Sequence, residues 1–122
     1  MAIVVMRSFI IDRGNFTEFE RLSREGIWPY FEARGCKILG LYTNLHGGSS
    51  DEVVLLTAYD SLAHWEGTRL GVPPPAATGE EVHRLAKVAE EAGRERAKLV
   101  RSTSSRVLRL ATDFVNLRVH PG

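Results

Sequence analysis

The feature that most constrains the fold is a pair of strand-forming runs that are apolar on both faces. Residues 53–59 read Val-Val-Leu-Leu-Thr-Ala-Tyr, and residues 3–11 read Ile-Val-Val-Met-Arg-Ser-Phe-Ile-Ile. Successive side chains of a strand point to opposite faces of a sheet, so a strand with one face in water alternates apolar and polar residues. These runs do not alternate in this way. Both faces of the sheet that contains them therefore require burial.

The rest of the chain alternates between strand-like and helix-like segments. Further strands are predicted over 36–45 and 106–115, and helical segments are predicted over 15–35, 61–69 and 78–101. The resulting order, β-α-β-β-α-β, is typical of an α+β ferredoxin-like fold, in which a four-stranded antiparallel sheet carries helices on one face. We interpret residues 1–122 as a single domain, since 122 residues is an ordinary length for one.

Polar caps and a proline mark the expected ends of the helices. Asn15 and Thr78 are each followed three residues later by a glutamate, which is the spacing of a capping box. Ser61 is expected to cap the short helix that follows it. Pro29 lacks a backbone donor and disfavours helix at Trp28, so we expect a kink or a break there.

One copy of this fold supplies helices for only one face of its sheet. The other face would expose the alternate residues of the central run, Val54, Leu56 and Ala58. A second copy packed sheet against sheet covers that face, and two-fold symmetric dimers are the commonest oligomers. We therefore expect a homodimeric α/β barrel.

Charge and cysteine content exclude several broad classes of function. Lys and Arg number 16 against 15 Asp and Glu, so no overall field predicts a nucleic acid or an acidic membrane as partner. No apolar run approaches the roughly 20 residues of a membrane-spanning helix, and the first residues lack the basic region of a secretory signal. The single cysteine, Cys36, is typical of a reducing cytoplasm, which is the expected location.

A local run of basic residues near the end of the long helix is the exception. Its members are Arg94, Arg96, Lys98, Arg101, Arg106 and Arg109. We interpret the run as a solvated helix end, because basic side chains in the last turns interact favourably with the helix dipole. A nucleic-acid-binding patch is the alternative interpretation.

Several short motifs, in a consistent order, resemble those of a known family. They are Met6-Arg7-Ser8-Phe9, Gly14-Asn15-Phe16 with Phe19, Trp28-Pro29, the run 35–43, Val53-Val54, and Tyr59-Asp60-Ser61-Leu62 with Arg69. In this order and spacing the sequence resembles NIPSNAP-type proteins of the dimeric α/β-barrel superfamily. The resemblance covers residues 3–70 and, more weakly, the last strand. Three positions depart from the family pattern. The family usually has an acidic residue in place of Met6 and a tyrosine in place of Phe9. It also usually has a tryptophan near the position of Thr57.

The resemblance implies the ferredoxin-like fold and the dimer. Neighbouring branches of the superfamily include cofactor-free monooxygenases, haem-handling enzymes, and catalysts that form polyketides or lactones. All of them use a pocket between the sheet and its helices. The resemblance therefore implies a pocket at that place in this chain, and it leaves the reaction open.

Arg7 is the most unusual candidate residue, because it is a charge inside an apolar strand. Such a charge is either paired or faces a cavity. One interpretation is a cation that holds an anionic or enolate-like oxygen of a substrate. The other is a structural ion pair with Asp113 on the predicted last strand, and structural pairs are the commoner fate of such groups.

Aromatic and polar residues of the second and third strands are further candidates. Tyr42, Asn44 and His46 share one face of the second strand, and Tyr59 ends the third. These side chains are suited to binding and polarising a phenol or a ketone, with His46 as a proton shuttle. The alternative is that His46 is solvated in the turn, and that Tyr42 belongs to the core or to the dimer interface.

His64 is our first candidate for a proton-transfer residue, since it lies on the short helix beside the expected pocket. Trp28 and Trp65 are candidates for the walls of a cavity that binds an aromatic molecule. The structural alternative places both tryptophans in the core and His64 on the surface.

No pattern in the sequence predicts a metal or a cofactor. The histidines are scattered, without the close spacing of a zinc or iron site. No phosphate-binding loop or dinucleotide-binding motif is present. Cys36 begins a strand without a neighbouring base, so we expect it to pack in the interior rather than to act as a nucleophile. We therefore expect a protein without a cofactor.

These observations favour a small cofactor-independent enzyme that acts on an aromatic or polyketide-like molecule of secondary metabolism. The expected reaction is driven by proton transfer: a cyclisation, isomerisation or dehydration, or an oxygenation in which the substrate's carbanion activates dioxygen. Arg7 would stabilise negative charge and His64 would move the proton. The residues expected to bind the substrate are Trp28, Tyr42, Asn44, Tyr59 and Trp65. The alternative is a non-catalytic homodimer that binds a small molecule or serves as a scaffold.

Overall fold

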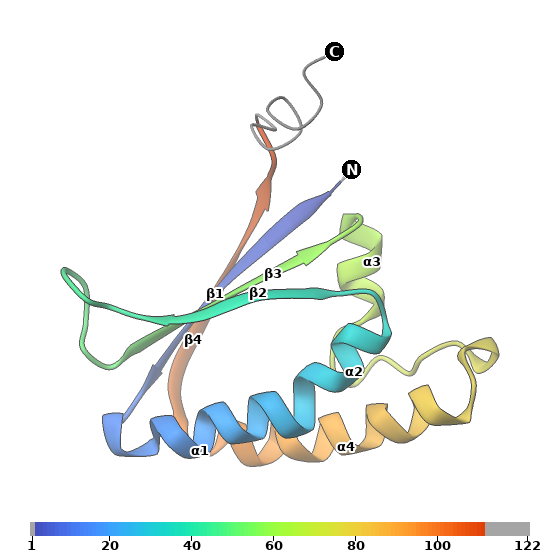
Figure 1. Cartoon of the computed structure of the whole chain (residues 1–122), viewed down its shortest axis with the longest axis horizontal. Coiled ribbons are helices and arrows are strands. Elements are labelled where there is room, and N and C mark those ends of the chain that lie inside the picture. The colour runs from blue at the N-terminus through green and yellow to red at the C-terminus, as the bar shows by residue number, and fades with distance from the viewer. Residues whose placement is uncertain (1, 112–122) are drawn as a thin grey trace.

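The chain folds into one antiparallel sheet with helices on a single face (Figure 1). The computed structural model describes residues 2–111. Within this range the strands are β1 (Ile3–Ile11), β2 (Lys37–Thr43), β3 (Glu52–Tyr59) and β4 (Val100–Arg109), arranged across the sheet in the order β2-β3-β1-β4. Every neighbouring pair is antiparallel, which confirms the predicted ferredoxin-like α+β fold.

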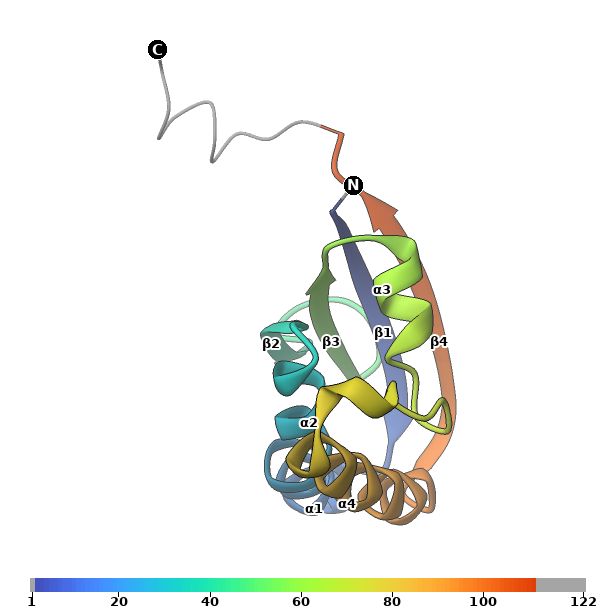
Figure 2. The same ribbon diagram turned by 90° about the vertical axis from the view of Figure 1, so that its right-hand side faces the viewer.

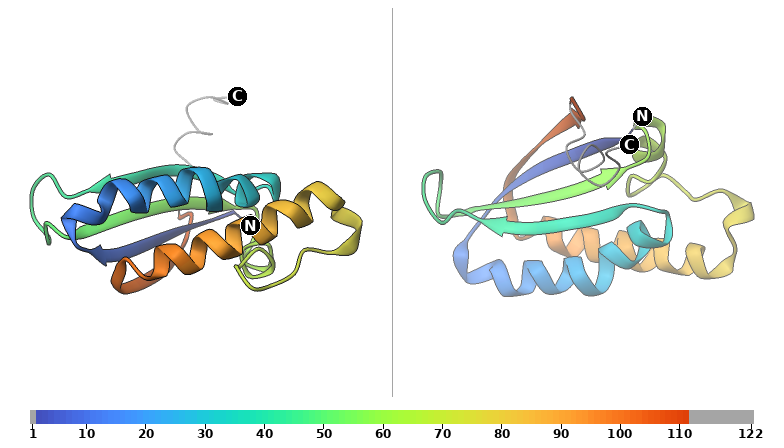
Figure 3. Two further views of the ribbon diagram at one scale, coloured as in Figure 1. Left: turned by 90° about the horizontal axis from the view of Figure 1, so that it is seen from below. Right: turned by 45° about the horizontal axis from the view of Figure 1, so that its top comes forward.

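The helices lie beneath this sheet and at one end of it. In the described part of the chain the helical segments are η1 (Arg13–Asn15), α1 (Phe16–Arg21), η2 (Leu22–Ile27), α2 (Trp28–Ala33), α3 (Leu62–Gly67), η3 (Ala76–Thr78) and α4 (Glu80–Ala97). Figures 1 and 2 show α1, α2 and α4 under one face, with α3 near the end of the sheet. From below, α1 and α4 lie side by side (Figure 3). None of the helices among residues 2–111 combines the length and the apolarity needed to cross a membrane.

The first helical region changes its geometry before Pro29, as the sequence predicts. Pro29 occupies the first turn of α2, where a backbone N–H has no helical acceptor and its absence is tolerated. The preceding segment, η2, is π-helical, and the Ser23 hydroxyl donates to the Phe19 carbonyl at 2.9 Å. The break expected at Trp28 therefore takes the form of a widened turn that joins α1 to α2.

Gly26 allows η2 to approach α4 closely. A Cβ atom at position 26 would overlap the Cβ of Ala92. The contact lies on the buried face of α4, where Ala89 and Ala92 are almost fully covered. Small residues on both sides thus set the separation of the two helical segments.

The core lies between the sheet and these helices. Phe9 and Ile11 of β1 and Leu55 of β3 pack against Phe19 of α1. The ring centroids of Phe9 and Phe19 are 4.9 Å apart in an edge-to-face arrangement. Alternate residues of β1 and β3 face this core, so the residues between them face the other side of the sheet.

That other side, which we call the open face, carries no helix from residues 2–111 (Figure 2). The register places Ser8, Val54 and Tyr42 next to one another on it. The apolar residues of the open face are Val4, Met6, Ile10, Tyr42, Val54, Leu56, Ala58 and Leu108. The two central strands are therefore apolar on both faces, and the described chain covers only one of them.

The two predicted capping boxes are wrong, and the predicted serine cap is confirmed. The Asn15 side chain makes no capping bond to α1. The Thr78 hydroxyl donates to the Pro75 carbonyl at 2.7 Å, and α4 begins beyond it without a side-chain cap. The Ser61 hydroxyl accepts the backbone N–H of His64 at 3.0 Å and so caps α3.

β4 begins earlier in the sequence than predicted. Residues 102–105, which lie between the helix predicted over 78–101 and the strand predicted over 106–115, pair with β1, and Ser105 lies opposite Arg7. β4 is an edge strand whose residues from 101 onward are exposed, so its polar side chains remain in contact with water. Of the strand predicted over 106–115, residues 112–115 lie outside the described part of the chain.

Candidate functional site

A cavity of about 400 Å³ lies on the helix-covered face of the sheet, between β1, β4 and the C-terminal half of α4. We call it the arginine cavity. Among its lining residues are Arg7, Phe9, Phe31, Arg69 and Arg96. A recess of about 40 Å³ shares the three arginines and continues to Tyr59 and Trp65. This is the region, between sheet and helices, in which the sequence predicts a pocket.

Arg7 contacts an aromatic ring and a hydroxyl group in this cavity, and no carboxylate among residues 2–111. Its Cζ lies 4.6 Å from the Phe9 ring centroid, and its Nε donates to the Thr103 Oγ1 at 3.2 Å. Burial, together with the nearby charge of Arg69, lowers the pKa of Arg7. The ion pair predicted with Asp113 involves a residue outside the described part of the chain.

Arg96 is buried, which corrects the interpretation of the basic run as a solvated helix end. The residue is only 5% exposed. Its Nη1 donates to the Ser23 Oγ at 2.8 Å, and its Cζ lies 4.9 Å and 5.1 Å from the ring centroids of Phe9 and Phe19. Burial first, and the charge of Arg7 second, lower the pKa of Arg96.

Arg69 is a third arginine around the cavity, beside Arg7 and Arg96, and Arg101 at its rim is a fourth. It follows α3, and its Cζ lies 4.6 Å from the Trp65 ring centroid. Among residues 2–111, no salt bridge involves Arg7, Arg69 or Arg96. No described aspartate or glutamate lines the cavity or the recess. The site is therefore electropositive and suited to a negatively charged group.

Sequence reasoning missed Arg69 and Arg96 as site residues. Arg96 follows Ala92 by four residues and Ala89 by seven, which is the spacing of a buried helix face. This spacing predicts that Arg96 is buried with the two alanines. Arg69 carries no comparable signal, because its position beside Arg7 depends on how the segment after α3 folds back onto the sheet.

Phe31, Tyr59 and Trp65 form an aromatic side of the recess. Burial raises the pKa of the Tyr59 phenol and of the Cys36 thiol, which lie in one buried cluster. Both groups therefore stay protonated at neutral pH, so they add polarity to the recess without adding negative charge. The structure thus brings together three of the predicted site residues, namely Arg7, Tyr59 and Trp65.

His64 packs beside the aromatic side of the recess, and both of its ring nitrogens are bound by backbone groups. Nδ1 accepts the N–H of Asp60 at 3.0 Å, and Nε2 donates to the Arg34 carbonyl at 2.5 Å. These bonds fix the tautomer and tie α3 to the end of α2. The ring lies edge-on to Tyr59, with centroids 5.4 Å apart, and does not line the cavity. Proton transfer by His64 stays a prediction, and it would require one of these bonds to open.

A family model matches almost the whole of this architecture. The NIPSNAP model covers residues 4–113. The chain belongs to the NIPSNAP family. This confirms the resemblance inferred from the sequence, and it places the arginine cavity within a NIPSNAP domain.

Solved structures of NIPSNAP proteins have the same fold. A NIPSNAP family protein from Agrobacterium tumefaciens C58 is 23% identical, with 93% of this chain and 96% of that chain covered and a TM-score of 0.69. A NIPSNAP domain protein from Burkholderia xenovorans is 20% identical, with 90% and 95% covered and a TM-score of 0.67. A candidate antibiotic biosynthesis monooxygenase from Chloroflexus aurantiacus is 10% identical, with 93% and 97% covered and a TM-score of 0.57. No curated protein matches the chain significantly.

Other residues predicted for the site lie outside the arginine cavity of this NIPSNAP chain. Trp28 packs against the core, and its buried Nε1 has no acceptor among residues 2–111. Tyr42 is 49% exposed on the open face, across the sheet from the cavity. Asn44 and His46 lie in the connection between β2 and β3, where His46 is exposed. Their proposed roles in binding stay predictions.

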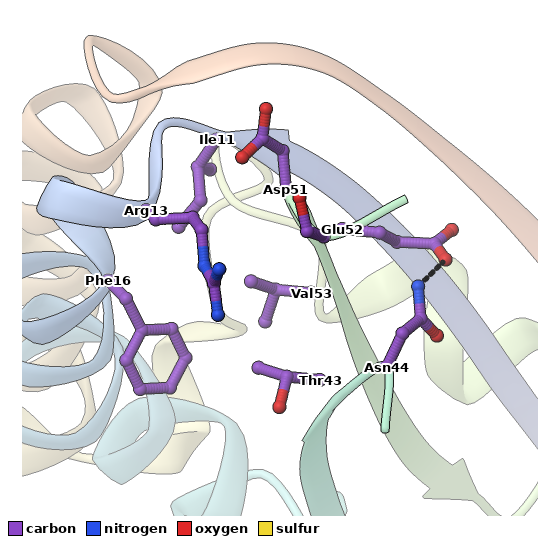
Figure 4. Close-up of a pocket in the computed structure, with 9 residues that line it drawn as sticks. Ile11, Arg13, Phe16, Thr43, Asn44, Asp51, Glu52 and Val53 are labelled. Atoms are coloured by element: carbon purple, nitrogen blue, oxygen red, sulfur yellow. Dashed lines mark hydrogen bonds between the residues drawn. The ribbon is translucent and has the colours of Figure 1, made fainter. Parts of the chain in front are cut away.

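Asn44 belongs instead to a second pocket, of about 350 Å³, beside the start of α1 (Figure 4). Its Nδ2 donates to the Glu52 Oε1 at 3.0 Å. Figure 4 shows the Arg13 guanidinium directed between Phe16 and β3, with Asp51 and Glu52 at the rim. This pocket therefore combines a cation with carboxylates, in contrast to the arginine cavity. Within residues 2–111, no three His, Cys, Asp or Glu side chains gather as metal ligands would.

Proposed function

We propose that this NIPSNAP protein is a small cytoplasmic enzyme that acts, without a cofactor, on an aromatic or polyketide-like molecule bound in the arginine cavity. The observation that carries the proposal is the combination of aromatic walls with three guanidinium groups around one cavity. Its volume of about 400 Å³ lies within the range of small-molecule sites.

Guanidinium donors suit a reaction that develops negative charge on oxygen. Removal of a proton from the carbon beside a carbonyl group produces an enolate, and preorganised cations lower the free energy of that charge. Cyclisation, isomerisation and dehydration can proceed from the enolate, and so can oxygenation, in which the carbanion passes an electron to dioxygen. The C. aurantiacus protein of the same fold is described as a candidate antibiotic biosynthesis monooxygenase. We assign charge stabilisation to Arg7 and retain His64 as the proposed proton-transfer residue.

A non-catalytic binding or scaffold homodimer is the alternative function. The observation that favours it is the hydrogen bonding of His64, whose two ring nitrogens are engaged with the backbone. No histidine, aspartate or glutamate among residues 2–111 lines the cavity or the recess. A general base is therefore the component that an enzyme of this kind would still need.

Deuterium exchange separates the two functions, because carbon deprotonation is the step shared by the proposed reactions. Aromatic 1,3-diketones would be incubated with the protein in D₂O, and deuterium incorporation followed by NMR. The enzyme proposal expects accelerated incorporation, lost in Arg7→Gln and retained in Arg94→Gln, an exposed arginine on α4. If Arg7→Gln and His64→Gln both exchange as fast as the unmodified protein, the proposed catalytic assignment is wrong.

We also propose that two copies pair through their open faces. The support is the band of apolar side chains there, which includes Met6, Val54 and Leu56, and a two-fold axis would pair this band with itself. Val54→Lys is expected to reduce the sedimenting mass from twice 13.6 kDa to 13.6 kDa. Val72→Lys, in an exposed loop, is the matched control. Unmodified protein that sediments as a 13.6 kDa particle would refute the dimer.

A further inference from the structure

Building on this proposed function, we infer that the ligand of the arginine cavity is an aromatic anion whose carboxylate is bound jointly by Arg7, Arg69 and Arg96. The sequence singled out only Arg7, as one cation in one strand. The structure joins it to two further arginines from α4 and from the segment after α3. These come from distant parts of the chain and converge on one space.

The charge balance of the cavity carries the inference. A charge removed from water requires a counter-ion or dense hydrogen bonding, and like charges nearby increase that requirement. Arg96 is buried, Arg7 is half-buried and Arg69 is exposed, so the requirement is greatest at Arg96. Among residues 2–111, the cavity arginines receive only two hydroxyl partners, Thr103 for Arg7 and Ser23 for Arg96. Arg101, at the rim of the same cavity, shows the contrast, because it forms salt bridges with Asp12 and Asp51.

The free donors have the geometry that a carboxylate needs. Arg7 uses Nε on Thr103, which leaves both of its terminal nitrogens available. Arg96 uses Nη1 on Ser23, which leaves Nη2 and Nε. A guanidinium presents its N–H groups in a plane that matches the two oxygens of a carboxylate. Both guanidinium groups lie close to the Phe9 ring centroid, at 4.6 Å and 4.9 Å, and both residues line the same cavity.

The buried donor is held in place before any ligand arrives. The Ser23 hydroxyl donates its proton to the Phe19 carbonyl and accepts one hydrogen bond from Arg96, so it is held from both sides. The close contact between Gly26 and Ala92 fixes η2 against α4 one turn before Arg96. A cation that does not have to reorganise binds an anion more tightly than a mobile one.

The remaining lining specifies the rest of the ligand. Phe31, Leu70 and Trp65 face the cavity or its recess with apolar surface. Arg69 stacks on Trp65, so its charge adjoins this apolar part of the wall. A ligand that fills such a space has a charged end and an aromatic body, as an aromatic carboxylic acid does.

Paired probes test the charge separately from the aromatic body. 2-Naphthoate and its neutral isostere 2-naphthamide would be titrated into the full chain by calorimetry, with the indole N–H resonance of Trp65 reporting occupancy of the recess. We expect 2-naphthoate to bind at least tenfold more tightly than 2-naphthamide. Arg7→Gln and Arg69→Gln should each remove this preference, and Arg94→Gln should preserve it.

The outcomes separate the inference from the function on which it rests. Equal affinity for the two probes, or a preference that survives Arg7→Gln and Arg69→Gln, overturns the anion assignment and leaves a neutral aromatic site. Failure of both probes to bind or to shift Trp65 overturns the cavity as a small-molecule site, and the proposed function with it. Asp113→Asn is expected to leave the affinity unchanged. A tenfold rise in that variant would show that Asp113 occupies the arginines in the free protein, and would also overturn the assignment.

Discussion

Two sets of arginines in this protein differ in their partners. Four arginines on the outer surfaces of the helices each pair with a glutamate three or four residues away, namely Arg21, Arg24, Arg84 and Arg94. Three arginines of the cavity, Arg7, Arg69 and Arg96, pair with no carboxylate in residues 2–111, whereas Arg101 at its rim pairs with two. Exposed pairs contribute little to stability, whereas a buried cation without a counter-ion lowers it.

The difference does not arise from a shortage of acidic residues. The sequence contains 15 of them against 16 basic residues. The fold satisfies the outer arginines locally, through helical spacing, and leaves the inner ones without an acidic neighbour. An arrangement that lowers stability in the free protein is typical of a site whose counter-ion is a ligand.

Arg96→Met tests this comparison most severely. Methionine retains a long side chain without charge, so we expect carboxylate binding to be lost. We also expect the free energy of unfolding of the free protein to rise by about 1–3 kcal/mol, because the desolvated cation is gone. Urea denaturation measures this change. Arg94→Met, on the outer face of the same helix, should leave stability nearly unchanged, and a marked loss of stability in Arg96→Met would mean that this arginine is structural.

Ser105→Asp tests whether a carboxylate on the protein itself can serve as the counter-ion of the cavity arginines. Ser105 lies opposite Arg7 on β4 and lines the recess, so an aspartate there would supply the absent counter-ion. We expect the unfolding free energy to rise by about 1 kcal/mol and the affinity for 2-naphthoate to fall at least tenfold. Ser104→Asp places the same charge on the open face and should give neither effect. If Ser105→Asp and Ser104→Asp change stability and affinity equally, the cavity arginines do not lack a counter-ion in the way that the comparison requires.

His64→Ala tests whether His64 stabilises the fold around the cavity without contributing to carboxylate binding. The substitution leaves the Asp60 N–H and the Arg34 carbonyl without their partner, so we expect a loss of about 1–2 kcal/mol in thermal or urea unfolding. Affinity for 2-naphthoate should stay within twofold. A tenfold loss of affinity at unchanged stability would instead place His64 among the ligand-binding residues.

The smallest expected effect is that of pH on carboxylate binding. Burial lowers the pKa of Arg7 and Arg96, but from values so high that both guanidinium groups keep their charge at neutral pH. The carboxylate of the probe is ionised above about pH 5. Affinity measured by calorimetry should therefore be flat between pH 6 and 8. A fall in affinity between pH 6 and 7.5 would indicate that a histidine contributes to the site.

Apolar patterning was sufficient to predict most of the fold. The runs at 3–11 and 53–59 form the two central strands, each hydrogen-bonded to a strand on both sides, and their alternate residues are buried against the helices. Residues 102–105 were misassigned because an edge strand accepts the polar residues that also end helices. Capping was misjudged at Thr78, whose hydroxyl bonds back to Pro75 instead of to the helix ahead.

The candidate site was predictable only in part. Arg7 stood out as a charge in an apolar strand, and Arg96 has the phase of a buried helix face, so both are visible in the sequence. The convergence of Arg69 on them depends on tertiary folding. The same holds for His64, because its hydrogen bond to Arg34 joins residues thirty positions apart. Spacing in one sequence contains no information about such a contact.

The π-helical turn η2 makes the packing of the first helical region sensitive to the number of residues in it. Such a turn accommodates one residue more than regular α-helix does. Deleting one residue between 22 and 27 would return this segment to regular α-helix with α1 and α2 nearly in phase, whereas inserting one more residue there would rotate α1 against α2 by about 100°. Ser23 would then turn away from Arg96, and the guanidinium would lose the hydroxyl that orients it. This region should therefore tolerate many substitutions on its outer surface and very few further insertions.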